Sequence, residues 1–189
     1  MRTLIKGNIA RYGGIVAATI LIAFGIGSIV TGFDGRDRIH DNLAAEKIVG
    51  TPDSTIPNQK VDTGKEAEAF AAVTRKHTLE ATGGKVYAEL PRAVYKDSGK
   101  PVPDEQAEAA LKSGEAINNP LRDMWLNQIS LSTALNTAYF AESVSTFAIV
   151  MGFALLLTGV GFGIVSIRLL RRREEADVRV PAAGAAITA

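Results

Sequence analysis

The chain has 189 residues, of which 47% are hydrophobic and 22% are charged, and its 21 basic and 20 acidic side chains leave a formal net charge of +1. A protein that binds nucleic acid needs a basic surplus to contact phosphates, so this balance speaks against such a partner. The charges are unevenly spread, because residues 1–33 and 146–189 together hold 8 basic and 3 acidic side chains, whereas residues 34–145 hold 13 and 17.

Two uncharged runs predict an all-α membrane protein with two transmembrane helices. Residues 12–33 and 143–167 contain no charged side chain, and none of the 7 prolines falls in either run. The shorter run makes a helix of roughly 33 Å, enough to cross a hydrocarbon core of about 30 Å. A cleaved signal peptide is the alternative for the first run. We expect an uncleaved anchor, because the run exceeds a signal h-region of about 7 to 15 residues and no small-residue cleavage site follows it.

Basic residues near the ends of the two runs predict that both termini are cytoplasmic, because cytoplasmic flanks carry the excess of lysine and arginine. Residues 1–11 and 168–189 are then cytoplasmic, the latter disordered at its end, and residues 34–142 lie outside the cytoplasmic membrane. The expected topology anchors are Arg11, Arg168, Arg171, Arg172 and Arg173.

Residues 34–123 predict a mostly helical extracytoplasmic region. The spacing of apolar residues and the positions of proline and glycine predict six elements in this region. They are a short outward continuation of the first helix, a connector at 51–64, a helix at 65–81, an extended segment at 85–90, a loop at 91–103 and a helix at 104–117 with Asp104 as its N-cap. Of 31 apolar side chains in this region, 13 are alanine, which makes a thin core. We expect it to pack against residues 124–141, another copy or a partner protein.

Residues 124–142 predict an amphipathic, membrane-proximal helix. No proline or glycine separates it from the second run, so one long helix from about 121 to 170 is the simplest interpretation. Trp125, Tyr139 and Phe140 are expected at an aqueous interface, where amphipathic aromatic rings collect.

Small residues in the two runs predict that the spans pack together as a helical hairpin. Small side chains let helices approach closely in a membrane. The alternative is that glycine is simply common in membrane helices. The predicted packing residues are Thr19, Ala23, Gly27 and Thr31 on the first span and Gly159 and Gly163 on the second.

The sequence offers little catalytic chemistry, with two histidines and no cysteine. His77 and Glu80 lie one helical turn apart but are too few for a closed metal site, and a solvated helix face explains them better. A hydrolase using carboxylate pairs such as Asp104 and Glu108 is disfavoured, because these residues fall on an exposed-looking helix. We therefore predict no catalytic, cofactor-binding or metal-binding residues, no cofactor and no enzymatic activity.

Three stretches carry a resemblance to known proteins. They are AEKI at 45–48, GGKVYAE at 83–89, and STALN at 132–136 leading through YFAE at 139–142. On these the chain resembles uncharacterised actinobacterial membrane proteins with two spans and an extracytoplasmic helical insert. Some of those proteins carry the name aromatic ring-opening dioxygenase, but this sequence lacks the two-histidine, one-carboxylate cluster of a ferrous site. The resemblance implies an architecture and a bacterial origin, and it implies no catalytic residues.

These features predict a non-enzymatic accessory or scaffold subunit of a membrane assembly, whose partners are the lipid bilayer and another membrane protein or a second copy of this chain. The alternative is a sensor that binds a ligand or an envelope polymer outside the cell. Because its cytoplasmic tail of about 20 residues leaves no room for a signalling domain, such a sensor would signal through a partner.

Overall fold

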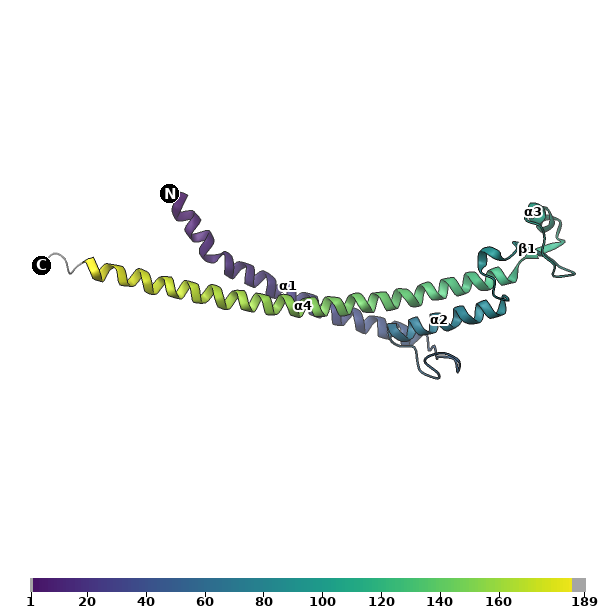
Figure 1. Cartoon of the computed structure of the whole chain (residues 1–189), viewed down its shortest axis with the longest axis horizontal. Helices are drawn as coiled ribbons and strands as arrows, with labels where there is room; N and C mark the ends of the chain where they lie inside the picture. The colour runs from purple at the N-terminus through teal and green to yellow at the C-terminus, as the bar shows by residue number, and fades with distance from the viewer. Residues whose placement is uncertain (1, 185–189) are drawn as a thin grey trace. The chain divides into compact units, whose positions relative to one another are not determined.

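The computed structural model describes residues 2–184, and it describes side chains for residues 12–172. The fold is mostly helical, as predicted (Figure 1). Its elements are α1 (Arg2–Ala45), α2 (Gly64–Ala81), a single 3-10 turn (Tyr87–Glu89), β1 (Ala93–Tyr95), α3 (Asp104–Ser113), β2 (Ala116–Asn118) and α4 (Pro120–Gly184).

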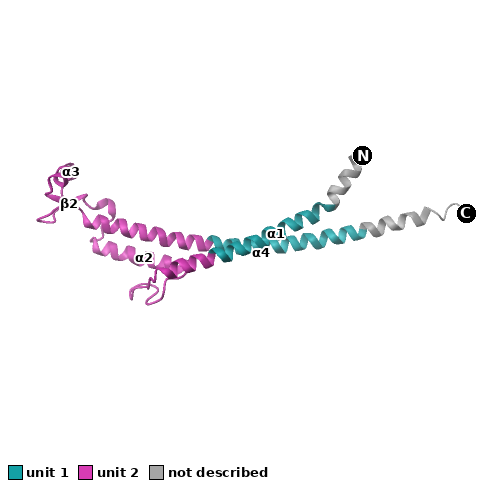
Figure 2. Cartoon of the chain, turned by 180° about the vertical axis from the view of Figure 1, so that it is seen from behind, with its two compact units in different colours: residues 1–35, 144–189 teal, residues 36–143 magenta. Residues whose placement is uncertain are grey.

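The chain divides into two compact units, whose boundaries fall close to the ends of the predicted spans (Figure 2). Unit 1 comprises residues 1–35 and 144–189, and unit 2 comprises residues 36–143. Within the described residues, two helices are long and apolar enough to cross a membrane: the most apolar 18-residue windows of Tyr12–Ala45 and Pro120–Arg172 have mean hydropathies of 2.2 and 2.3.

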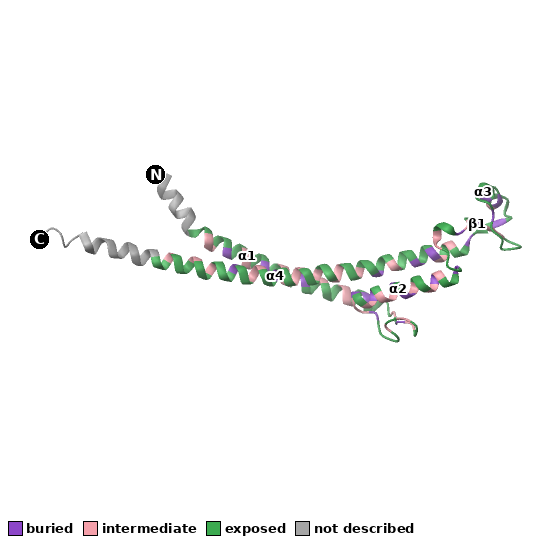
Figure 3. Ribbon diagram, viewed as in Figure 1, coloured by how far each residue is buried: buried purple, intermediate pink, exposed green. Residues whose placement is uncertain are grey.

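The described part of unit 1 is mostly exposed, with few buried positions (Figure 3). Small residues occupy the buried positions, and large apolar residues lie outside. Every buried residue whose side chain is described in this unit is a glycine or an alanine: Ala18, Gly25, Gly32, Gly152 and Gly159. Large apolar side chains point outward instead, with Phe24 68% and Leu157 69% exposed. A water-soluble fold does the opposite and buries its large apolar groups.

Unit 2 has its apolar residues inside, in two small clusters. Leu43, Val61 and Leu135 form one cluster with Ala67 and Ala71 of α2, so the predicted outward region packs on α4 within the same chain. The second cluster joins α3 to the strands through Ala93, Val102, Ala107, Ala110 and Ala116. Alanine supplies much of both cores, consistent with the thin core expected from composition.

The first turn of α2 is stabilised by a capping box. The Thr63 hydroxyl accepts a hydrogen bond from the Glu66 backbone N–H, and the Glu66 carboxylate accepts one from the Thr63 N–H at 3.0 Å. Burial alone would raise the pKa of Glu66, but the hydrogen bonds from Asp62 and Thr63 outweigh burial and hold that pKa below its usual value. The helix therefore begins at Gly64, one residue before the predicted start.

The predicted helix at 104–117 is too long, because Gly114 adopts a left-handed conformation with φ 81° and ends α3 at Ser113. The following residues form β2, which pairs antiparallel with β1 in the register Ala93 to Asn118. A two-stranded sheet therefore lies where a loop and a helix end were expected. Asp104 was predicted to be the N-cap of this helix, but it is the first residue of α3, and the N-cap is Pro103. The segment predicted as extended at 85–90 contains a 3-10 turn.

Trp125 is buried within unit 2 rather than placed at an aqueous interface. Its side chain is 1% exposed, and its Nε1 donates a hydrogen bond to the backbone oxygen of Lys85 at 3.0 Å. The Arg75 guanidinium lies 5.3 Å from the centre of its ring. Tyr139 and Phe140, by contrast, are exposed on α4.

Candidate functional site

The contact between α1 and α4 in unit 1 is built from backbone meeting backbone. A Cβ added to Gly25 would lie 2.8 Å from the carbonyl oxygen of Gly152, and one added to Gly159 would lie 3.0 Å from that of Ala18. The contacting residues increase in number along α1, from Ala18 to Gly25, while their partners decrease in number along α4, from Gly159 to Gly152. The two helices therefore run antiparallel. Any larger side chain at these glycines would force the two backbones apart.

The spacing of this contact is seven residues on both helices. Ala18, Gly25 and Gly32 recur on α1, and on α4 the sequence Ser145, Gly152, Gly159 and Ser166 recurs at the same interval. A seven-residue repeat corresponds to 3.5 residues per turn, the period of left-handed helix pairs. Small residues at this period keep one narrow seam between the helices.

The structure corrects the packing face predicted for α1. Gly159 does lie against α1, and Gly163 lies near Ala18, but Thr19, Ala23, Gly27 and Thr31 are all exposed. A Cβ on Gly27 would meet no atom within 4 Å. The physical reason is the helical period: positions four apart drift by about 40° per step, so residues 19 and 31 lie about 120° apart around the helix.

Part of this exposed face forms a groove in unit 1. Ala23, Gly27 and Thr31 line it from α1, and Ala148 contributes from α4. Its lining is mainly apolar, and it is large enough to admit side chains from another helix. Three of the four residues predicted to form the packing face of α1 therefore border a surface that the described part of the chain leaves open.

The predicted topology anchors are only partly described. Arg168, Arg171 and Arg172 are exposed on α4. Arg11 and Arg173 lie outside the residues whose side chains the structure describes.

Glu142 joins three segments of unit 2. Its Oε1 lies 3.2 Å from Nε of Arg36 on α1, and its Oε2 accepts a hydrogen bond from the backbone N–H of Gly64 at the start of α2. The Glu142 side chain is only 14% exposed. Gly64 approaches α4 so closely that an added Cβ would lie 2.7 Å from Cα of Tyr139. Sequence reasoning missed this role, because nothing local connects residue 142 with residues 36 and 64.

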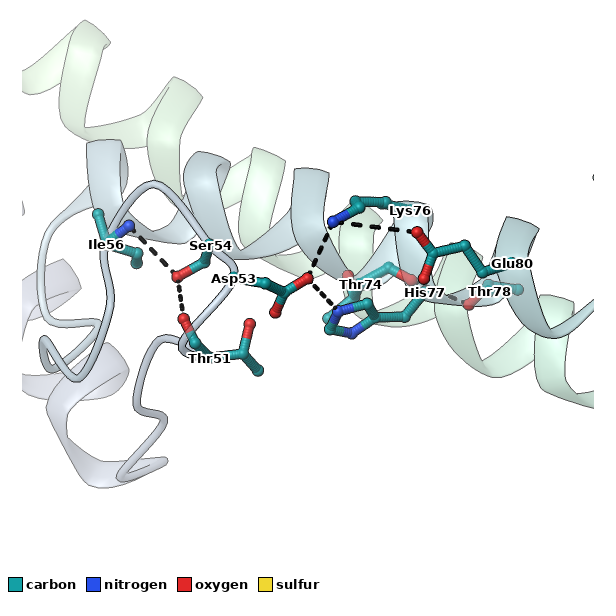
Figure 4. A network of polar contacts seen from close by, with 9 residues as sticks. All are labelled: Thr51, Asp53, Ser54, Ile56, Thr74, Lys76, His77, Thr78 and Glu80. Atoms are coloured by element: carbon teal, nitrogen blue, oxygen red, sulfur yellow. Dashed lines mark hydrogen bonds and ion pairs between the residues drawn. The ribbon is translucent and has the colours of Figure 1, made fainter.

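His77 belongs to an ion-pair network that holds the connector to α2 (Figure 4). Asp53 Oδ2 lies 2.8 Å from His77 Nε2 and 3.0 Å from Lys76 Nζ, and Lys76 also lies 3.9 Å from Glu80. Glu80 thus contacts Lys76, while His77 contacts Asp53. Among the described residues, no group of three or more histidine, cysteine or acidic side chains could hold a metal ion.

This network predicts acid sensitivity of the connector. Hydrogen bonds from His77 first, and then from Lys76, hold the pKa of Asp53 well below its usual range. A depressed carboxyl pKa makes the contact fully present above the unfolded-state pKa of about 3.9 and weakens it only as pH falls toward the folded-state value. Amide hydrogen exchange of residues 50–60, followed as the pH is lowered below about 4, should show the connector loosening.

Asp53→Asn should loosen the connector at neutral pH and remove most of this pH dependence, because the charged acceptor is gone. Asp97→Asn is the matched control, since Asp97 is an exposed aspartate outside the network. Equal exchange in the wild type and in Asp53→Asn at neutral pH would contradict the role of the network.

The described residues define a mostly helical protein with two helices long and apolar enough to cross a membrane. The chain matches no protein-family model, and it has no significant match among curated proteins or solved structures.

Proposed function

We propose that this chain spans the cytoplasmic membrane twice as a helical hairpin and serves as a non-enzymatic accessory or scaffold subunit of a membrane assembly. Residues 34–142 lie outside the membrane and both termini lie in the cytoplasm. The observation that carries the proposal is the inverted packing of unit 1, where glycine and alanine are buried and large apolar side chains are exposed. Lipid is the solvent that accepts such a surface.

The open groove on unit 1 supports a partner inside the membrane. Among the described residues, no atom lies within 4 Å of a Cβ added to Gly27, and Ala23 and Thr31 line the groove with it. Helices in lipid associate through small residues that permit close approach. We propose that a transmembrane helix of the assembly, from another protein or a second copy, packs there.

Extraction in mild detergent followed by native mass spectrometry tests this proposal. The wild-type chain should leave the membrane with another membrane protein or a second copy, and Gly27→Leu should release it as a monomer by filling the groove. Gly161→Leu is the matched control, because Gly161 also has no atom near its Cβ position but does not line the groove. A stable wild-type monomer would overturn the assembly role.

The absence of cysteine lets the topology be tested in the same preparation. Cysteine placed at Ser98 should react with an impermeant maleimide in intact cells, and cysteine placed at Ala176 should react only after permeabilisation. The opposite pattern would overturn the orientation, and labelling of neither or both positions in intact cells would overturn the two-span arrangement.

A further inference from the structure

Two arginines converge on a polar pocket of unit 2 beside the first turn of α4. The pocket has a volume of about 280 Å³ and is lined by Arg92, Arg122, Asp123 and Asn118, with Tyr87 at one wall. Within the part of the chain whose side chains are described, no carboxylate forms an ion pair with Arg92 or Arg122. Two guanidinium groups in one pocket therefore lack an acidic partner from the protein itself.

Arg122 lies over an aromatic ring at one wall of the pocket. Its guanidinium carbon lies 4.2 Å from the centre of the Tyr87 ring, a close cation–π contact. A guanidinium that lies flat on an aromatic ring keeps its N–H edge free to donate. That edge is the fork that binds the two oxygens of a carboxylate or phosphate.

The backbone around Arg92 is fixed by Asn119, which is buried. Its side-chain amide donates to the Pro91 carbonyl at 2.9 Å, its backbone N–H donates to the Arg92 carbonyl at 3.1 Å, and its Oδ1 caps α4 by accepting from the Leu121 N–H at 3.0 Å. The strand β1 begins immediately after Arg92. Both arginines are therefore attached to a framework that is already hydrogen-bonded.

We propose that this pocket binds a small oxyanion, a phosphate or a carboxylate group, between Arg92 and Arg122. The side chains of Arg92, Arg122 and Asp123 give the lining a formal net charge of +1, and the first turn of α4 adds the positive end of a helix dipole. Asp123 opposes the anion and limits the affinity. This site lies wholly in unit 2 and does not depend on the proposed membrane assembly.

Trp125, the only tryptophan, lies one helical turn from Arg122 and precedes the pocket residue Leu126, so its emission is used to follow binding. The full-length protein in detergent is titrated with inorganic phosphate and, separately, with acetate, at an ionic strength held constant with sodium chloride. A saturable change in tryptophan emission is expected with at least one of them. Saturation by phosphate alone identifies a phosphate ligand, and saturation by acetate identifies a carboxylate ligand. No saturable change with either anion overturns the proposal.

Two variants should move the affinity in opposite directions. Arg92→Gln should weaken binding about tenfold through loss of a charge-assisted hydrogen bond, and Asp123→Asn should tighten it about threefold through loss of a repelling charge. Lys100→Gln, which removes an exposed positive charge outside the pocket, should change binding by less than about twofold. An equal effect of Lys100→Gln and Arg92→Gln, or weaker binding in Asp123→Asn, would show that the anion is not held in this pocket.

Discussion

Cysteines placed at positions 18 and 163 are expected to form a disulfide within one chain. A Cβ on Gly163 would lie 3.7 Å from Cβ of Ala18, and disulfides have Cβ atoms about 3.8 Å apart. The natural chain contains no cysteine, so the Ala18→Cys/Gly163→Cys protein has only this pair to oxidise. Mobility on non-reducing gels and mass spectrometry of the linked peptides measure the yield.

The close glycine contact should control that yield. Gly152→Leu is expected to lower it severalfold, because a Cβ at this position already lies 2.7 Å from the Gly25 carbonyl oxygen and a leucine would push the helix backbones apart at a cost of about 3 kcal/mol. Gly27→Leu should leave the disulfide intact, since nothing lies within 4 Å of its Cβ position.

The pair Thr19→Cys/Gly163→Cys is the matched negative control, because Thr19 is next to Ala18 along α1 but lies on the exposed face that the sequence predicted for packing. If it crosslinked as well as the pair at 18 and 163, α1 would present the face predicted from the sequence, and the seven-residue seam would be wrong. Together with the assembly test, these variants separate the contact within the chain, which depends on Gly152, from the proposed contact between chains, which depends on Gly27.

Glu142→Ala is expected to destabilise unit 2 by about 2 kcal/mol. The substitution removes the acceptor for the Gly64 N–H and the partner of Arg36. The Gly64 N–H would then lie near α4 without an acceptor, and the desolvation of this unpaired donor destabilises the folded state. Hydrogen exchange of the Gly64 amide and of the first turn of α2 should accelerate accordingly. Thermal denaturation of the full chain in detergent gives the loss of stability.

Glu108→Ala provides the comparison for an exposed ion pair. Glu108 lies 2.8 Å from Lys112, one turn away on α3, with both side chains largely exposed. Such pairs contribute about 0.3–0.5 kcal/mol, so this variant should change stability little. If Glu142→Ala were as mild as Glu108→Ala, the three-way junction at Glu142 would not hold unit 2 together.

Local signals in the sequence were sufficient for the main helices. The long uncharged runs predicted α1 and α4, and the apolar spacing from Ala67 to Thr78 predicted α2 to within a residue at its start. The outward continuation of α1 was also predicted, and it reaches Ala45. These features follow from hydrophobic periodicity and helix breakers, which act over a few residues.

Contacts between distant residues were not predictable in this way. β1 and β2 are three-residue strands that exist only because they pair with each other, so neither has a local pattern long enough to identify. Asp53 and His77 are 24 residues apart, and Trp125 is buried by a segment 40 residues before it. Each of these residues can be read from the sequence, but no local pattern indicates which distant residue it contacts.

The sequence by itself determined that two long apolar helices flank a charged, mostly helical region, because uncharged length is a local property of the chain. Only the tertiary structure decided which small residues of α1 meet α4. Two patterns of small residues coexist on that helix, one at intervals of four and one at intervals of seven, and both are compatible with packing. The backbones of α1 and α4 approach along the seven-residue seam, because it stays on one side of the helix.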